Sequence, residues 1–165
     1  MEELEIIDEQ ENVKCTAQKE VVHTKGLLHK SIHILIFDND RKIYCRYRNP
    51  QKSVNPGWTA SVGAHVLPGE DYDTTAKRAL KSMLRLSCAL YKIGKIRVRT
   101  SSENEISETY LGHIRTHSEI CDPTAEDSKF FTIEEIRELA LQKKTTPHLI
   151  QSVEIYMGSR DGRSP

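Results

Sequence analysis

The chain has 165 residues, with 24 basic and 24 acidic side chains. That length is typical of one domain with a hydrophobic core of its own, and the balanced charge argues against a general nucleic-acid or membrane-surface role. No apolar run approaches the roughly 20 residues of a membrane span, and the acidic start resembles neither a secretory signal nor a transit peptide. The four cysteines are scattered without a CxxC pair, which favours reduced thiols and a cytoplasmic location.

The first part of the chain has mainly strand patterns. A strand is expected to begin at residues 5–7, and a second is expected over residues 13–22, with Val13, Cys15, Ala17 and Val21 as candidates for its inward face. Residues 31–37, SIHILIF, form the strongest predicted strand because the run is continuous, apolar and β-branched. Turn residues follow, and residues 42–48 complete a predicted hairpin over residues 31–48.

The rest of the chain alternates between strands and helices. Residues 58–65 predict a strand, and a Pro-Gly turn then leads into a helix over about residues 72–86. Strands are expected over residues 89–99 and 105–116 and at residues 130–131. Helices are expected from the Thr132 capping-box pattern to about residue 142, and over residues 146–157. This order predicts an α+β fold in one domain over residues 1–158, followed by a flexible tail over residues 159–165.

Residues 57–86 carry the most informative pattern, a glycine loop followed by a helix with acidic residues at its start. This layout resembles the signature of the Nudix superfamily, G-x5-E-x7-R-E-U-x-E-E-x-G-U, where U is apolar. The resemblance covers most of the chain and implies the Nudix α/β/α sandwich, a mixed sheet flanked by helices. In that signature, three late glutamates share one helix face and hold Mg²⁺ against a diphosphate.

This chain departs from the signature at its metal-binding positions. Glu70 and Arg78 match, but the three glutamates fall at Ala79, Ser82 and Met83. Alanine and methionine are not useful Mg²⁺ ligands and a serine hydroxyl is a weak one, so the ordinary pyrophosphohydrolase mechanism is disfavoured. Glu70 and Arg78 stay candidates for ligand binding, and a structural pair between loop and helix is the alternative that we rank higher.

A second group of residues offers metal ligands outside this signature. His23 and His29 come from one loop, His65 from the strand before the helix, and Glu103 and Glu105 from the start of a later strand. Together they offer three nitrogens and two oxygens, a set that suits Zn²⁺, Mn²⁺ or Fe²⁺ better than Mg²⁺. The alternative is a chance grouping of surface or hydrogen-bonded residues, which is the default for histidines in a chain with seven of them.

The same residues resemble the metal site of the type I isopentenyl-diphosphate isomerases, which are Nudix-fold enzymes with a degenerate signature. Those enzymes use three histidines and two glutamates in this order, and the segments VHTKGLLH, WTASVGAHV and ENE are similar to theirs. The resemblance implies a divalent metal ion and a small-molecule diphosphate, to which Mg²⁺ can also bind. It assigns Lys19, Arg48 and Lys52 to diphosphate binding, with solvated surface charge as the alternative for each.

The chain departs from the isomerases at the groups that move protons. The thiol of that family falls at Gly63, a Mg²⁺-binding glutamate falls at Met83, and an aromatic residue falls at His148. Ser61 is a weak substitute for the thiol, because a hydroxyl is a poor proton donor to an alkene. Glu105 keeps the position that binds metal and acts as acid or base. Isomerase activity is therefore disfavoured as well.

Three classes of function stay open at this point. One is an enzyme of the isomerase-like branch with rearranged catalytic groups, including a hydrolase of nucleoside diphosphate derivatives. The second is a non-catalytic module that binds a diphosphate or a metal. The third is a structural or interaction protein in which the His/Glu group is incidental. We expect no nucleic-acid or membrane partner, and the sequence leaves the oligomeric state open.

Overall fold

A computed structural model describes residues 1–161 of the chain, with side chains described through residue 159. The strands in this range are β1 (Glu3–Ile7), β2 (Val13–Gln18), β3 (His29–Phe37), β4 (Ile43–Arg48), β5 (Gly57–Thr59), β6 (Val62–His65), β7 (Tyr91–Arg99), β8 (Asn104–His113) and β9 (Ser128–Phe131). The helices are α1 (Lys19–Thr24), α2 (Tyr72–Leu84), α3 (Ile133–Leu141) and α4 (Pro147–Asp161), with a short 3-10 helix η1 (His117–Glu119).

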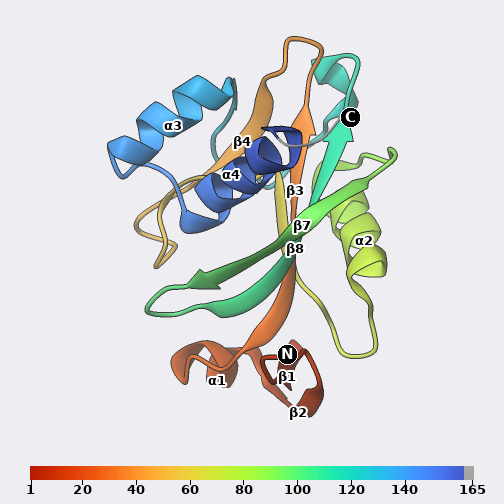
Figure 1. Cartoon of the computed structure of the whole chain (residues 1–165), viewed down its shortest axis with the longest axis vertical. Coiled ribbons are helices and arrows are strands. Elements are labelled where there is room, and N and C mark those ends of the chain that lie inside the picture. The colour runs from red at the N-terminus through yellow and green to blue at the C-terminus, as the bar shows by residue number, and fades with distance from the viewer. Residues whose placement is uncertain (162–165) are drawn as a thin grey trace.

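A mixed sheet lies at the centre of the molecule, with helices on both faces (Figure 1). Its strand order is β5-β4-β3-β8-β7, with β6 also paired to β3 and β9 to β4. Strands β3 and β8 run parallel, whereas β6 and β7 are antiparallel to their neighbours. Helix α2 packs on one face, and α3 and α4 pack on the other. The predicted α+β fold with a mixed sheet is confirmed.

Strand β3 is apolar along most of its length because helices bury both of its faces. Ile32, Ile34 and Ile36 pack with α2, while Leu35 packs with α3 and α4. Side chains alternate along a strand, so a strand that is covered twice reads as a continuous apolar run. The face shared with Leu35 changes character at the start of β3, where its residues are His29, Ser31 and His33, all buried.

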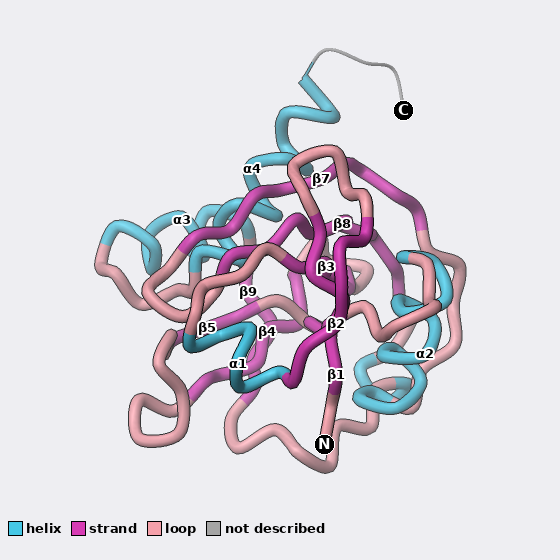
Figure 2. The backbone as a smooth tube through the Cα atoms, turned by 90° about the horizontal axis from the view of Figure 1, so that it is seen from below, coloured by secondary structure: helices cyan, strands magenta, loops and turns pink. Residues whose placement is uncertain are grey.

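The predicted second strand is wrong in its second half. Strand β2 ends at Gln18, and the residues that follow form α1. The predicted inward face is also wrong for Val13, Cys15 and Val21, which are exposed. Strands β1 and β2 form a separate two-stranded ribbon at the N-terminal end of the molecule, so β2 contributes little to the core (Figures 1 and 2). The β-branched residues in α1 suggest a strand locally, but burial of Val22 against neighbouring elements sets the structure.

The predicted hairpin over residues 31–48 is only partly correct. Strands β3 and β4 pair at a single position next to the turn, Phe37 with Ile43. Beyond that point β6 takes the place beside β3, and β4 pairs with β5 and β9.

The strand predicted over residues 58–65 is correspondingly two strands, β5 and β6, with different neighbours. Ser61 lies between them and is fully buried. Its hydroxyl accepts from the Ile36 amide at 2.8 Å and donates to the Tyr44 carbonyl at 2.6 Å. It thereby satisfies backbone groups of β3 and β4 where the two strands separate.

Helices α2, α3 and α4 agree with the expected pattern apart from their ends. Thr132 caps α3, and its side chain accepts from the Glu135 amide while the Glu135 carboxylate accepts from the Thr132 amide. Helix α2 ends at Leu84, where Arg85 adopts a left-handed conformation with φ of 55°. Helix α4 continues through residues 159–161, so these residues are helical and not a tail, and residues 162–165 lie outside the described part.

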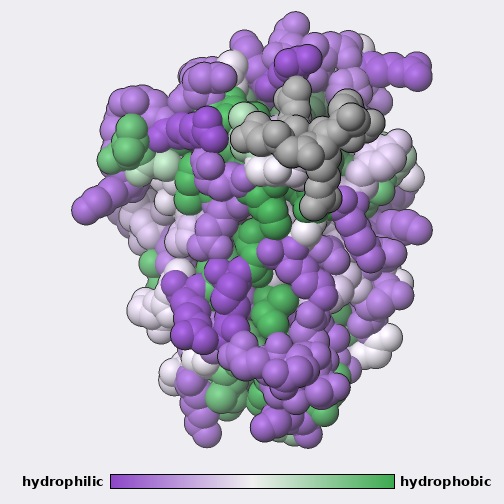
Figure 3. All heavy atoms as spheres, in the orientation of Figure 1, coloured by the Kyte–Doolittle hydropathy of each residue, from purple (hydrophilic) through white to green (hydrophobic). Residues whose placement is uncertain are grey.

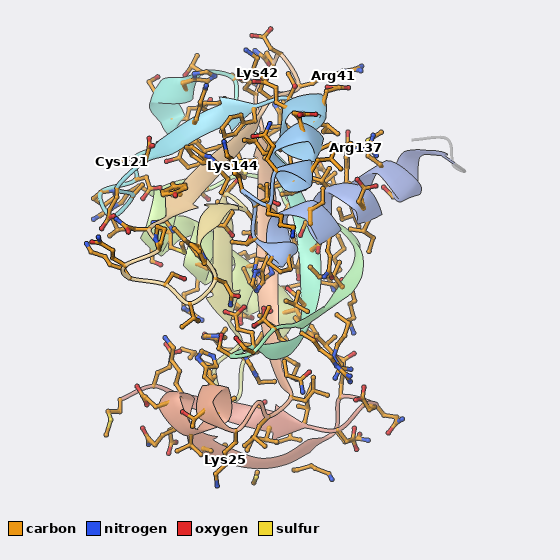
Figure 4. The ribbon with its side chains drawn as sticks, turned by 90° about the vertical axis from the view of Figure 1, so that its left-hand side faces the viewer. Lys25, Arg41, Lys42, Cys121, Arg137 and Lys144 are labelled. Atoms are coloured by element: carbon orange, nitrogen blue, oxygen red, sulfur yellow. The ribbon has the colours of Figure 1, made fainter. Side chains whose placement is uncertain are left out.

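The surface is polar over most of the face in Figure 3, with a narrow apolar strip near its middle. Lys25, next to α1, lies at one end of the molecule, and Arg41 and Lys42, in the turn after β3, lie at the other (Figure 4). Within residues 1–161, no helix is long and apolar enough to cross a membrane.

Candidate metal centre

Three histidines from separate elements come together between helix α1 and the sheet. His23 lies in the last turn of α1, His29 begins β3, and His65 ends β6. Their ring centroids are 5.1 to 5.4 Å apart. One ring nitrogen from each lies within 4.8 Å of the others. Lys19 is the first residue of α1, and its spacing of four residues from His23 places both side chains on the same helix face.

Hydrogen bonds orient two of these rings toward a common point. Nδ1 of His29 lies 2.9 Å from the Leu27 carbonyl oxygen, and Nδ1 of His65 lies 3.3 Å from a Glu2 carboxylate oxygen. Both oxygens accept hydrogen bonds, so in the neutral rings Nδ1 carries the proton and Nε2 presents a lone pair. Nε2 of His65 lies 3.3 Å from Nε2 of His23. A second nitrogen held in this way is characteristic of metal-binding histidines.

The test of fit to a metal ion rests on one atom, Nε2 of His29. It is buried, and among the residues that the structure describes it has no hydrogen-bond partner. A buried polar nitrogen without a partner is costly, and a divalent cation at this point would satisfy it. Burial, followed by the neighbouring histidines, lowers the pKa of His65 to about 4 and also lowers the pKa of His23. Neutral imidazole is the form that binds metal, and these two rings supply it. At His29 burial would lower the pKa but Glu105 raises it, so a metal ion there would have to displace a proton.

Glu105 joins this cluster, whereas Glu103 does not. Oε2 of Glu105 lies 3.3 Å from Nε2 of His29 and 4.0 Å from Nε2 of His65. Burial alone would raise the pKa of Glu105, but the adjoining His148 and His29 hold it well below its usual range. Oε1 of Glu103 lies 4.0 Å from Arg48, and its Oε2 lies 2.7 Å from Nε2 of His148. Four of the five predicted ligands therefore lie together, whereas the closest contacts of Glu103 are with Arg48 and His148.

Two histidines of the site were not among the predicted ligands. His33 and His148 are both almost fully buried, and their ring centroids are 4.8 Å apart. Burial would lower the pKa of His148, but the carboxylates of Glu103 and Glu105 raise it to about 9. The alternation of His29, Ser31 and His33 along β3 could have indicated that His33 lies on the same face as His29, since every second residue of a strand shares one face.

A cavity of about 270 Å³ opens beside these residues. It is lined by three basic and three acidic side chains, together with histidines and small residues: Lys19, Arg48 and Arg78; Glu2, Glu103 and Glu105; His33, His65 and His148; Ser31, Gly63 and Ala64. The formal charges of its three basic and three acidic residues cancel, and the raised pKa of His148 adds a single positive charge at neutral pH. A divalent cation would make the cavity more strongly positive.

The structure separates the other predicted ligand-binding residues. Lys52 pairs with Glu126 and lines a neighbouring cavity, which shares Arg48 and Gly63 with the first. Glu70 lies outside both cavities and binds Arg78 through two hydrogen bonds of 2.7 and 2.9 Å. Ser61 likewise lies outside both, with its hydroxyl bonded to the backbone.

The helix positions that would carry Nudix glutamates form no polar site. Ala79 is buried in the core, and Met83 packs against that core. The Ser82 hydroxyl donates to the Ala79 carbonyl at 3.4 Å, as a residue satisfied within its own helix does. This face of α2 therefore offers packing where the signature has ligands.

Comparisons with known proteins show one likeness in sequence and another in fold. No family model matches the chain. The chain is 29% identical over 113 residues to an isopentenyl-diphosphate Delta-isomerase of Pectobacterium atrosepticum, covering 68% of this chain and 63% of that enzyme. It is 26% identical over 144 residues to one of Streptomyces griseus, covering 82% of this chain and 73% of that enzyme. The chain thus spans less than two thirds of the first relative's length.

Solved structures share the fold at low identity. A protein of Deinococcus radiodurans superposes with a TM-score of 0.77 at 17% identity, covering 98% of this chain and all of that one. A Nudix hydrolase of Nitrosomonas europaea has a TM-score of 0.60 at 19% identity, covering 78% and 88%. The Nudix domain of Shewanella oneidensis NrtR, solved with ADP ribose, has a TM-score of 0.57 at 13% identity, covering 78% and 86%.

These likenesses define the class of protein. The mixed sheet with its flanking helices is the Nudix fold. The chain therefore has the Nudix fold, and its sequence is similar to enzymes named isopentenyl-diphosphate Delta-isomerase.

Proposed function

We propose that this chain binds one divalent transition metal ion at His23, His29, His65 and Glu105, and a small molecule with a diphosphate group in the adjoining cavity. The observation that carries the proposal is the arrangement of the three imidazoles. One ring nitrogen from each lies within 4.8 Å of the others, and Nε2 of His29 is buried without an aligned hydrogen bond in the described part of the chain, 3.3 Å from Oε2 of Glu105. Three nitrogens and a carboxylate suit Mn²⁺, Zn²⁺ or Fe²⁺.

The cavity supports a diphosphate as the second ligand. Lys19 and Arg48 line it, and their side chains stay 40% and 31% exposed, so both are accessible to a ligand. Arg78 also lines the cavity but is bound to Glu70, and we assign it a smaller part. The metal ion supplies positive charge that polarises a phosphoryl oxygen. The likeness to enzymes named for isopentenyl diphosphate agrees with such a ligand.

We infer that neither of the two activities expected of this superfamily proceeds here in its ordinary form. Ala79, Ser82 and Met83 leave α2 without the carboxylates used for hydrolysis, and Gly63 stands where the isomerases have a thiol. Any catalysis would have to use Glu105, the buried carboxylate that faces both the histidines and the cavity. A binding module without turnover uses the same residues, so the two possibilities differ only in product formation.

Calorimetric titration with inorganic pyrophosphate tests this proposal. The purified chain, freed of metal and reloaded with Mn²⁺, is expected to bind pyrophosphate, and both His29→Ala and Arg48→Ala are expected to weaken binding at least about tenfold. His113→Ala removes an exposed histidine at the end of β8 and is the matched control. Equal affinity with and without Mn²⁺, or no binding by the wild-type chain, would contradict the proposal. Incubation with nucleoside and prenyl diphosphates then separates an enzyme from a binding module.

A further inference from the structure

A second cluster of ligand-type side chains lies deeper in the sheet, next to the centre already described. It consists of His33 on β3, Glu105 on β8 and His148 in the first turn of α4. One nitrogen or oxygen from each lies within 4.8 Å of the others. All three residues are at most 3% exposed. Three buried ligand-type residues from separate elements are an unusual concentration, since histidine and glutamate are seldom fully buried without a partner.

His33 is oriented as a metal-binding histidine would be. Its Nδ1 lies 2.6 Å from the Ser107 hydroxyl, and in the tautomer in which Nδ1 donates to that hydroxyl, Nε2 presents a lone pair. The side of the ring that carries Nε2 faces Gly63, where an added Cβ would lie 3.0 Å from both Nε2 and Cδ2. The glycine that replaces the isomerase thiol therefore provides room for this ring at the wall of the cavity.

The contacts of His148 are close, but they leave polar atoms unsatisfied. Its Nε2 lies 2.7 Å from Oε2 of Glu103 and 3.1 Å from Oε1 of Glu105. Nevertheless, among the residues that the structure describes, Oε2 of Glu103 and Nδ1 of His148 have no aligned hydrogen bond. Close approach without hydrogen-bond alignment also occurs between His29 and Glu105 in the first cluster. Unsatisfied buried polar atoms can mark a site that binds an ion, and a cation here would displace the proton that Glu103 and Glu105 favour on His148.

The two oxygens of Glu105 face different clusters. Oε2 lies 3.3 Å from His29, in the first cluster, and Oε1 lies 3.1 Å from His148, in the second. We propose that His33, Glu105 and His148 form a second divalent cation site, and that the Glu105 carboxylate bridges it to the first. The inference rests on the proposed function for its neighbouring ion. Imidazole and carboxylate ligands favour the same transition metals as the first centre.

The position of this second site differs from that of the Nudix glutamates. Those would lie on α2, where this chain has Ala79, Ser82 and Met83. His33, Glu105 and His148 come instead from β3, β8 and α4, on the sheet face that α3 and α4 cover. A bridged pair of cations held by these residues would add positive charge at the floor of the cavity.

Metal content measured by mass spectrometry tests the proposal. The full chain is stripped with a chelator, reloaded with Mn²⁺ and passed through a desalting column. The expected content is two Mn²⁺ per chain in the wild type and one in His148→Phe, an aromatic replacement of similar shape. His113→Phe makes the same change at an exposed histidine and is expected to keep two. Electron paramagnetic resonance of the wild type is expected to show a spin-coupled Mn²⁺ pair, which needs no variant.

The outcomes separate this inference from the proposed function. One Mn²⁺ per chain with an uncoupled signal overturns the second site and leaves the first intact, and His148 then serves only as a partner of the two carboxylates. Two Mn²⁺ that persist in a folded His148→Phe chain also overturn it. No retained Mn²⁺ contradicts the proposed function itself.

Discussion

Gly63 and His33 are predicted to be energetically coupled. The isomerase-like pattern has a thiol at position 63, but a Cβ added there would lie 3.0 Å from two atoms of the His33 ring. The ring has little freedom to move away, since Ser107 holds its Nδ1 at 2.6 Å and the His148 ring packs with a centroid distance of 4.8 Å. Even the smallest side chain at position 63 must therefore displace a buried and hydrogen-bonded ring.

The cost can be bounded from these contacts. Forcing additional atoms into a well-packed interior typically costs about 1–3 kcal/mol, and we expect Gly63→Ala to lower the free energy of unfolding by an amount in that range. In a His33→Ala background the obstacle is gone. The same substitution should then cost at least about 1 kcal/mol less, which is a coupling energy typical of residues in contact.

Urea unfolding of the two single variants, the double variant and the wild type, all in chelator, gives this coupling energy directly. Gly158→Ala is the matched control, because no atom lies within 4 Å of a Cβ added there. It lies within α4 and should stabilise the chain by about 0.5–1 kcal/mol. Equal costs of Gly63→Ala in both backgrounds, within about 0.5 kcal/mol, would refute the steric argument. In that case the absence of a thiol would be unrelated to His33.

Three further predictions follow from other parts of the fold. Hydrogen bonds from Arg78 are the largest cause that lowers the pKa of Glu70 from the usual 4.5 to about 2, so the pair stabilises the fold above pH 4.5 and loses this effect as the pH falls toward 2. Because Arg78 is partly exposed, we expect Arg78→Ala to lower the free energy of unfolding at neutral pH by only about 1 kcal/mol. Urea titrations should show that this difference in stability shrinks in acid. A difference that stays constant with pH would refute a stabilising ion pair between Glu70 and Arg78. Iodoacetamide should modify the exposed Cys15 and Cys121 first, while Cys45, whose thiol pKa is raised by burial, reacts only after unfolding; intact-mass analysis that finds early modification of Cys45 contradicts this. Thr132→Ala removes the cap of α3 and should lower the free energy of unfolding by about 1 kcal/mol, whereas Thr132→Ser should keep most of the stability that the cap provides. Calorimetric melting that shows equal losses of stability in both variants would exclude the capping role.

Local sequence patterns were sufficient for much of the fold but not for strand partners. The apolar run of β3 and the capping box of α3 are local signals, and both predicted their elements. The pairing of β3 with β6 and β8 depends on contacts between residues far apart in the chain, so the turn after β3 suggested a longer hairpin than forms. Helix α1 was missed for a similar reason, since its six residues include two valines and its Gln18 cap makes no side-chain hydrogen bond.

The candidate site, like the fold, could be predicted only in part. The three histidines and Glu105 were found from their order and from neighbouring motifs, and the structure places their side chains together. The orientation of Glu103 could not be read from the ENE segment, because it depends on His148 more than 40 residues later. His33 was overlooked because it lies within an apolar run, where its alternation with His29 and Ser31 was the only signal.

The proposed function depends on a metal ion bound by His23, His29, His65 and Glu105. Anomalous diffraction from crystals of the Mn²⁺-loaded chain, collected above and below the manganese absorption edge, would locate this ion. We expect a manganese peak within bonding distance of the Nε2 atom of His29 and of ligand atoms from the other three residues. A map without a peak between these side chains, from crystals in which the four residues are ordered, would show that they do not form a metal site.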